Sequence, residues 1–230
     1  MTQMLGVLVL ISAIAPCAAQ SPVAETATET AQRLPKVVLV GDSIRLSYTD
    51  EVRELLKGEV ELVSPAANGG DSANVLRHLQ RWVIEQQPDL VHLNCGIHDT
   101  KKFHATGEHQ VSPEQYANNL RQIVKMIREE TDAQVVFATS TPILDERAAQ
   151  VRKERDYALL NASIQQYNQI AVDVMRELKV PVNDLHRLLA VPPEGIQLPE
   201  LIVTDGVHLT AAGQQLLAEQ VARVVREQLK

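Results

Sequence analysis

The stretch Lys36–Val40, KVVLV, runs directly into Gly41-Asp42-Ser43 and decides the fold class. Five mostly apolar residues in a row, three of them valine, are typical of a strand that is covered on both faces. The Gly-Asp-Ser that follows favours a turn or a helix start, so we expect a buried strand leading into a loop. Four further short and mostly apolar runs predict similar strands: Val60–Val63, Leu90–Leu93, Gln134–Thr139 and Val180–Asn183.

Segments of helical period separate these runs. Ser112-Pro113-Glu114 predicts one helix start, since a capping serine before a first-turn proline marks a helix N-terminus. Helices are also expected around Leu76–Val83, over about Tyr157–Leu178 and from about Thr210 onward. Alternating strands and helices predict one α/β domain, a three-layer α/β/α sandwich with a mainly parallel five-stranded sheet.

Length and charge exclude some classes of protein. A chain of 230 residues fits one domain with a sizeable core, and its 45% hydrophobic content is that of a globular protein. The net charge of -7 argues against a nucleic-acid binder, which would need a basic face.

The N-terminus predicts export. Met1–Ala15 is largely apolar and is followed by small residues that end at Ala19, so we expect a signal peptide over residues 1–19. A flexible tether over residues 20–35 and a folded domain over residues 36–230 would follow. No Lys or Arg precedes the apolar run, so a retained membrane anchor and a lipoprotein attached through Cys17 are the alternatives.

An exported protein without its leader would be periplasmic or secreted, with no stable membrane insertion. Cys95 would then be the only cysteine left, which rules out an internal disulfide. We expect Cys95 to be a small buried hydrophobe.

Three unusual segments each follow a predicted strand: Ser43, the turn Asn68-Gly69-Gly70-Asp71, and Gly96-Ile97-His98-Asp99. Ligands bind beyond the carboxyl ends of parallel strands, so we expect all three segments at one edge of the sheet. Taken alone, each segment has a simpler interpretation: the first as a helix cap, the second as a turn with permissive glycines and the third as a surface loop.

A fourth segment, Asp205-Gly-Val-His208, adds a carboxylate and an imidazole. The spacing lets Asp205 reach one ring nitrogen of His208 while the other faces a nucleophile, which a serine needs to become reactive. The simpler interpretation of this segment is a turn that leads into a helix capped by Thr210. That interpretation accounts for Thr210 but for neither Asp205 nor His208.

The four segments, in this order from about Lys36 to the C-terminus, resemble the SGNH/GDSL hydrolase family of serine esterases and lipases. The resemblance implies a flavodoxin-like SGNH hydrolase fold for residues 36–230 and a catalytic triad of Ser43, His208 and Asp205. It also implies Gly70 as a backbone donor of the oxyanion hole, beside the Ser43 N–H. No cofactor is implied.

One position departs from the family pattern Gly-x-Asn-Asp, since His98 stands where the family has asparagine. A neutral histidine keeps one ring N–H, whereas a protonated one would donate more strongly and would make activity depend on pH near neutrality. We expect His98 to donate to the oxyanion; the alternative is that it only stabilises its loop.

Other histidines and lysines lie close by in the sequence. His98, Asp99, His104 and His109 match no established metal motif, so we expect no metal. Lys101 and Lys102 suggest either a rim that attracts an anionic substrate or an ordinary solvated loop.

These observations predict an exported serine esterase that works through an acyl-enzyme. Short acyl groups, such as acetyl, on carbohydrates or similar small substrates are favoured, because no extended apolar lid segment is visible. The segment Pro142–Asp156 is expected to border the site. The alternative is a non-catalytic carbohydrate- or lipid-binding protein that retains the hydrolase fold.

Overall fold

The computed structural model describes residues 1, 2, 6 and 33–230. Most of the expected signal peptide and most of the expected tether lie outside the described residues. Residues 34–230 form one compact unit, and the description below concerns that unit. No helix in the described part of the chain is long and apolar enough to span a membrane.

Strand β1, Lys36–Val40, lies inside a five-stranded sheet whose order is β2-β1-β3-β5-β7. All four strand pairs are parallel, and Val38 of β1 is aligned with Val63 on one side and Val91 on the other. The partner strands are β2 (Glu61–Val63), β3 (Leu90–Asn94), β5 (Gln134–Ala138) and β7 (Val182–Asn183). The predicted parallel five-stranded sheet is therefore confirmed.

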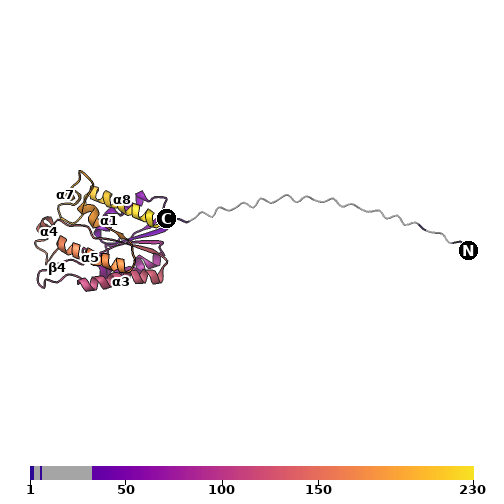
Figure 1. Ribbon diagram of the computed structural model, residues 1–230, viewed down its shortest axis with the longest axis horizontal. Coiled ribbons are helices and arrows are strands. Elements are labelled where there is room, and N and C mark those ends of the chain that lie inside the picture. The colour runs from indigo at the N-terminus through magenta and orange to yellow at the C-terminus, as the bar shows by residue number, and fades with distance from the viewer. Residues whose placement is uncertain (3–5, 7–32) are drawn as a thin grey trace. The chain divides into compact units, whose positions relative to one another are not determined.

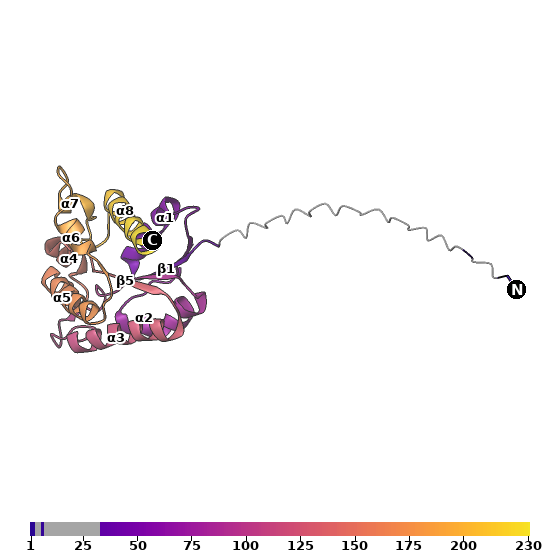
Figure 2. The same cartoon turned by 45° about the vertical axis from the view of Figure 1, so that its right-hand side comes forward.

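Helices cover both faces of the sheet, which gives the predicted three layers (Figure 2). Side chains of β1 alternate between these layers, as the two-residue period of a strand requires. Val37 and Leu39 pack with α1 (Ser43–Leu55) and α8 (Ala211–Gln228). Val38 and Val40 pack with the helices of the other layer, which are α2 (Ser72–Trp82), α3 (Pro113–Glu130) and α5 (Asn161–Glu177).

Two expected boundaries, at Tyr157 and Val180, differ from the structure by two residues or more. The helix expected from Tyr157 begins only at Asn161, because Tyr157–Ala158 forms β6 and pairs antiparallel with β4 (Lys102–Phe103). The strand expected from Val180 begins at Val182, because the Val180 N–H is bonded to the carbonyl of Met175 at the end of α5.

Short helices complete the unit. They are η1 (Ile84–Gln86), α4 (Asp145–Arg152), α6 (Leu185–Ala190) and α7 (Leu198–Leu201). Figure 1 shows α4, β4 and α7 gathered at one end of the folded unit, away from the C-terminus. Because β1 leads toward this end, Ser43 and the loops after the other strands lie there too.

Candidate functional site

Ser43 is the first residue of α1, and only Gly41 and Asp42 separate it from the end of β1. Asp42 caps this helix, since its Oδ1 accepts the Ile44 N–H at 2.9 Å. A side chain at Gly41 would meet Cβ of Arg45 at 2.9 Å, so a glycine is needed where the strand turns into the helix. The Ser43 Oγ lies 2.9 Å from Nε2 of His208.

Asp205 holds the other side of the His208 ring. Its Oδ2 lies 2.5 Å from Nδ1 of His208, and its Oδ1 accepts the backbone N–H groups of Val207 and His208 at 2.8 and 2.9 Å. Burial pushes the pKa of Asp205 upward, but these hydrogen bonds outweigh it and leave the pKa below its ordinary value. The ionised carboxylate therefore keeps the proton of His208 on Nδ1, and Nε2 is the acceptor that faces the serine.

The turn Asp205–His208 depends on a close backbone approach. Gly206 has φ of +75°, and a Cβ there would lie 2.5 Å from the Ala148 nitrogen and 2.6 Å from the Leu144 oxygen. The Leu144 N–H in turn donates to the Gly206 carbonyl at 2.8 Å. The start of α4 thus fixes the loop that carries Asp205 and His208.

Ser43 and His208 line a cavity of about 230 Å³ together with His98. Three other lining residues are apolar and the remainder are polar or charged. The full lining is Ser43, Asn68, Ile97, His98, Lys101, Arg152, Tyr157, Leu159, Val207 and His208. Arg152 belongs to Pro142–Asp156, which therefore borders the site as expected.

Two predicted site residues, Asp205 and Gly70, do not line this cavity; Asp205 lies behind the His208 ring. The Gly70 N–H donates to the Asn68 Oδ1 at 2.9 Å, so in this conformation a side chain already accepts it. Gly70 has a positive φ of +63°. Gly69 packs directly against the backbone of Gly41, and its N–H donates to the Gly41 carbonyl at 2.9 Å. The double glycine therefore brings the turn against the Ser43 segment.

Asn68 lines the cavity and was not among the predicted site residues. Its side chain is exposed, and no described residue accepts a hydrogen bond from its Nδ2. The spacing Asn-x-Gly could have indicated it, because asparagine side chains often bond the backbone two residues on.

His98 is half-buried, and its ring is not hydrogen-bonded to any residue in the described part of the chain. Burial, with the nearby charge of Lys101 adding to it, lowers the pKa of His98 to about 4. His98 is therefore neutral near pH 7 and offers one ring N–H to the cavity. This favours the neutral donor over the protonated one considered from the sequence.

Asp99, beside His98, is buried and joins two segments. Its carboxylate accepts both the N–H and the hydroxyl of Ser72, at the start of α2, at 3.0 and 2.5 Å. Burial raises the pKa of Asp99 to about 7 despite these bonds. The described residues hold no group of three or more potential metal ligands, and His109 instead meets Ser163 and the Tyr167 ring.

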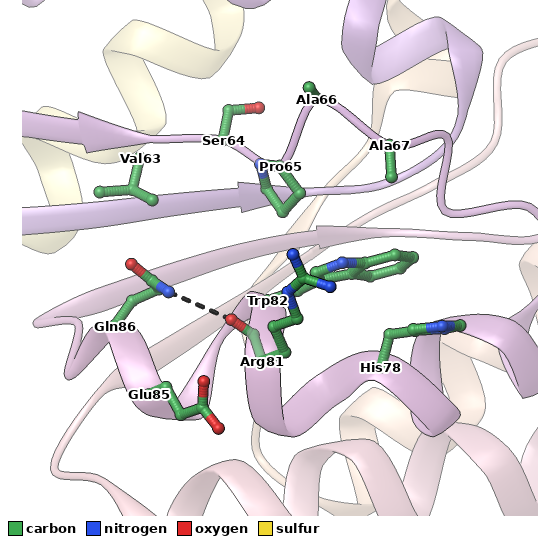
Figure 3. Close-up of a pocket in the computed structure, with 10 residues that line it drawn as sticks. All are labelled: Val63, Ser64, Pro65, Ala66, Ala67, His78, Arg81, Trp82, Glu85 and Gln86. Atoms are coloured by element: carbon green, nitrogen blue, oxygen red, sulfur yellow. Dashed lines mark hydrogen bonds between the residues drawn. The ribbon is translucent and has the colours of Figure 1, made fainter.

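A larger groove, of about 590 Å³, lies between the loop after β2 and α2 (Figure 3). The His78 ring stacks on Trp82 with centroids 4.5 Å apart, and its Nδ1 lies 2.9 Å from the Asn74 carbonyl. The hydroxyl of Ser64 accepts a hydrogen bond from Arg45 at 2.7 Å. Ser64 and His78 of this groove are not hydrogen-bonded to each other, so the groove lacks the serine–histidine pair that a serine hydrolase needs.

The chain is similar to known hydrolases over most of its length. The model of the GDSL-like lipase/acylhydrolase family matches residues 39–216. The GDSL esterase/lipase CPRD49 of Arabidopsis thaliana is 25% identical over 208 residues, which cover 84% of this chain and 79% of the relative.

Solved structures share the fold. The lipase/acylhydrolase from Enterococcus faecalis superposes with a TM-score of 0.68 at 22% identity, covering 85% of this chain and 97% of that one. The acetylxylan esterase Axe2 from Geobacillus stearothermophilus has a TM-score of 0.66 at 19% identity, covering 83% and 94%. At these identities the likeness establishes the architecture of the sheet and its covering helices.

Proposed function

The chain belongs to the GDSL-like lipase/acylhydrolase family of carboxylic ester hydrolases, and we propose that Ser43, His208 and Asp205 form its catalytic triad. The observation that carries this proposal is the chain of contacts from Ser43 Oγ to His208 Nε2 and from His208 Nδ1 to Asp205. A serine hydroxyl becomes a useful nucleophile only when such an oriented base takes its proton.

The reaction runs through an acyl-enzyme. His208 Nε2 takes the hydroxyl proton while Ser43 Oγ attacks the ester carbonyl, and the tetrahedral intermediate collapses as His208 protonates the leaving alcohol. Water then enters, loses a proton to His208 and attacks the acyl group. The carboxylic acid leaves and the hydroxyl of Ser43 regains its proton.

Three groups are proposed to hold the oxyanion: the N–H of Ser43, the N–H of Gly70 and the ring N–H of His98. The Ser43 N–H opens α1 and has no acceptor among the described residues, and a helix N-terminus favours negative charge. For Gly70 to take part, the oxyanion must replace the Asn68 Oδ1 as the acceptor of its N–H.

The substrate proposed is a short acyl ester, such as an acetyl group, on a carbohydrate or similar small alcohol. Support comes from the small cavity, whose aliphatic lining is limited to Ile97, Leu159 and Val207. The fold likeness to an acetylxylan esterase agrees with this choice. Export to the periplasm or the medium is proposed from the leader over residues 1–19.

Hydrolysis of p-nitrophenyl acetate and p-nitrophenyl octanoate tests the proposal. We expect faster turnover of the acetate, and a loss of at least about a thousandfold in Ser43→Ala. Ser47→Ala is the matched control, because Ser47 lies on the same helix and, among the described residues, its hydroxyl bonds only the Ile44 carbonyl. Hydrolysis that survives in Ser43→Ala would contradict the triad.

A further inference from the structure

Two cationic side chains, Lys101 and Arg152, line the cavity that holds Ser43 and His208. No Asp or Glu is among the described residues that line it. This local positive charge stands out because the chain as a whole carries a net charge of -7. A cavity lined by charges of one sign concentrates substrates of the opposite sign.

Lys101 is held in place by its backbone and by an aromatic ring. Its carbonyl accepts the Gln110 N–H at 2.7 Å, and its own N–H reaches the carbonyl of His98 at 3.4 Å. The Nζ lies 5.2 Å from the centroid of the Tyr157 ring, a cation–π contact that orients the ammonium. No carboxylate in the described part of the chain pairs with it, so its three N–H donors remain available.

Arg152 is the second cationic residue of the cavity and comes from a different segment of the chain than Lys101. It is the last residue of α4, and its Nη1 donates to the Asp205 carbonyl at 2.8 Å. This bond places the guanidinium beside the segment that carries the base. Its Nε and Nη2 have no acceptor among the described residues.

Two carboxylates near the cavity, those of Asp205 and Asp71, are already engaged. Asp205 binds the ring of His208, and Asp71 caps α2 through the Asn74 N–H at 2.8 Å and accepts from Gln110 at 3.2 Å. Neither lines the cavity, so neither neutralises the two cations by a direct ion pair.

We infer that the ester substrate carries a carboxylate, and that Lys101 and Arg152 bind it while the ester carbonyl lies at Ser43. Charge-assisted hydrogen bonds to a carboxylate are stronger than neutral ones, and a guanidinium can make two at once. This inference rests on the proposed function. The carboxylate can belong to the alcohol, as in an acylated acidic sugar, or to the acyl chain.

Two pairs of esters test the inference and separate these sources. For the alcohol side the pair is 4-acetoxybenzoate and its neutral methyl ester. For the acyl side it is the mono-p-nitrophenyl ester of adipic acid and p-nitrophenyl hexanoate. The readout is the ratio of kcat/KM for the anionic ester to kcat/KM for the neutral one, measured in each variant.

We expect this ratio to fall about fivefold to twentyfold in Lys101→Gln and in Arg152→Gln, for at least one pair. Arg152→Lys keeps the charge and should keep most of the ratio. Lys102→Gln is the matched control, because Lys102 is exposed and does not line the cavity. Higher salt should lower the wild-type ratio as well, because salt screens exposed charges.

The outcomes separate the inference from the proposed function. If neutral esters are hydrolysed and the ratio is the same in all variants for both pairs, the inference is overturned and the proposed function stands. If the wild-type protein hydrolyses none of the four esters, the proposed function is overturned and the inference with it.

Discussion

His98 occupies the position at which the family has an asparagine, and its role can be measured directly. His98→Ala removes the only side-chain N–H proposed for the oxyanion, so we expect kcat to fall about a hundredfold. His98→Asn restores a side-chain amide donor and should keep activity within about tenfold of wild type. Hydrolysis of p-nitrophenyl acetate by the three proteins gives the comparison.

The pH profile and the melting temperature separate catalysis from a purely structural role of His98. Because burial and Lys101 hold the pKa of His98 at about 4, it stays neutral above about pH 5. Wild type and His98→Asn should therefore have the same pH profile from pH 5 upward. A His98→Ala protein with full activity, or one whose loss of activity merely follows a lower melting temperature, would rule out the donor role.

For single residues, the sequence allowed us to predict contacts between residues that lie a few positions apart in one segment. Asp205 and His208 lie three residues apart in one turn, so their contact follows from the sequence. The partner of the Gly70 N–H could not be predicted in this way, because it depends on which rotamer Asn68 adopts. The surroundings of the turn in the folded protein determine the rotamer of Asn68.

Among the elements, Arg45 on α1 joins the turn after β1 to the loop after β2 at the site edge. Its side chain is buried and donates to the carbonyls of Gly41, Pro65 and Ala67 and to the hydroxyl of Ser64, all within 3.0 Å. Arg45→Met keeps the length of the side chain but leaves these acceptors without their donor. We expect it to lower the free energy of unfolding by about 2–4 kcal/mol.

Urea denaturation measures this loss, with Arg53→Met as the matched control on the same helix. Arg53 is exposed and donates to a single carbonyl, that of Leu62, so we expect a change below about 1 kcal/mol. Equal changes in the two variants would show that the buried contacts of Arg45 do not stabilise the site edge.

Elements with a clear apolar period were predictable and short polar ones were not. The five strands and the starts of α3 and α8 follow from apolar runs and from the caps Ser112 and Thr210. Helix α4 carries mostly polar residues, so no apolar period in the sequence indicated a helix there. Tyr157–Ala158 joined a helical pattern in the sequence, but long-range pairing with β4 makes it a strand.

At the scale of the molecule, two buried carboxylates in the described part of the chain make stability depend on pH. Burial raises the pKa of Asp42 to about 6 and that of Asp99 to about 7, from ordinary values of 3.8. Above about pH 4 the unfolded chain loses the protons of these two carboxyl groups, whereas the folded state still binds them. Proton binding by Asp42 and Asp99 therefore stabilises the fold fully below that pH, and this contribution is lost as the pH rises through 6 and 7.

Asp99→Asn isolates one of these two contributions, since asparagine does not titrate. Between pH 5 and pH 8 we expect the free energy of unfolding to fall more in wild type than in the variant, by about 1–3 kcal/mol. Urea denaturation at both pH values measures it. A variant whose pH dependence equals that of wild type, or exceeds it, would show that Asp99 is ionised throughout this range.

The reaction itself is tested most directly by labelling with a fluorophosphonate, followed by mass spectrometry of the intact protein and its peptides. The proposed triad predicts one adduct per chain, on the peptide that contains Ser43, and slow or absent labelling in His208→Ala. Ser47→Ala should be labelled like wild type. No adduct in the wild-type protein, or an adduct that persists in Ser43→Ala, would contradict the assignment of Ser43 as the nucleophile.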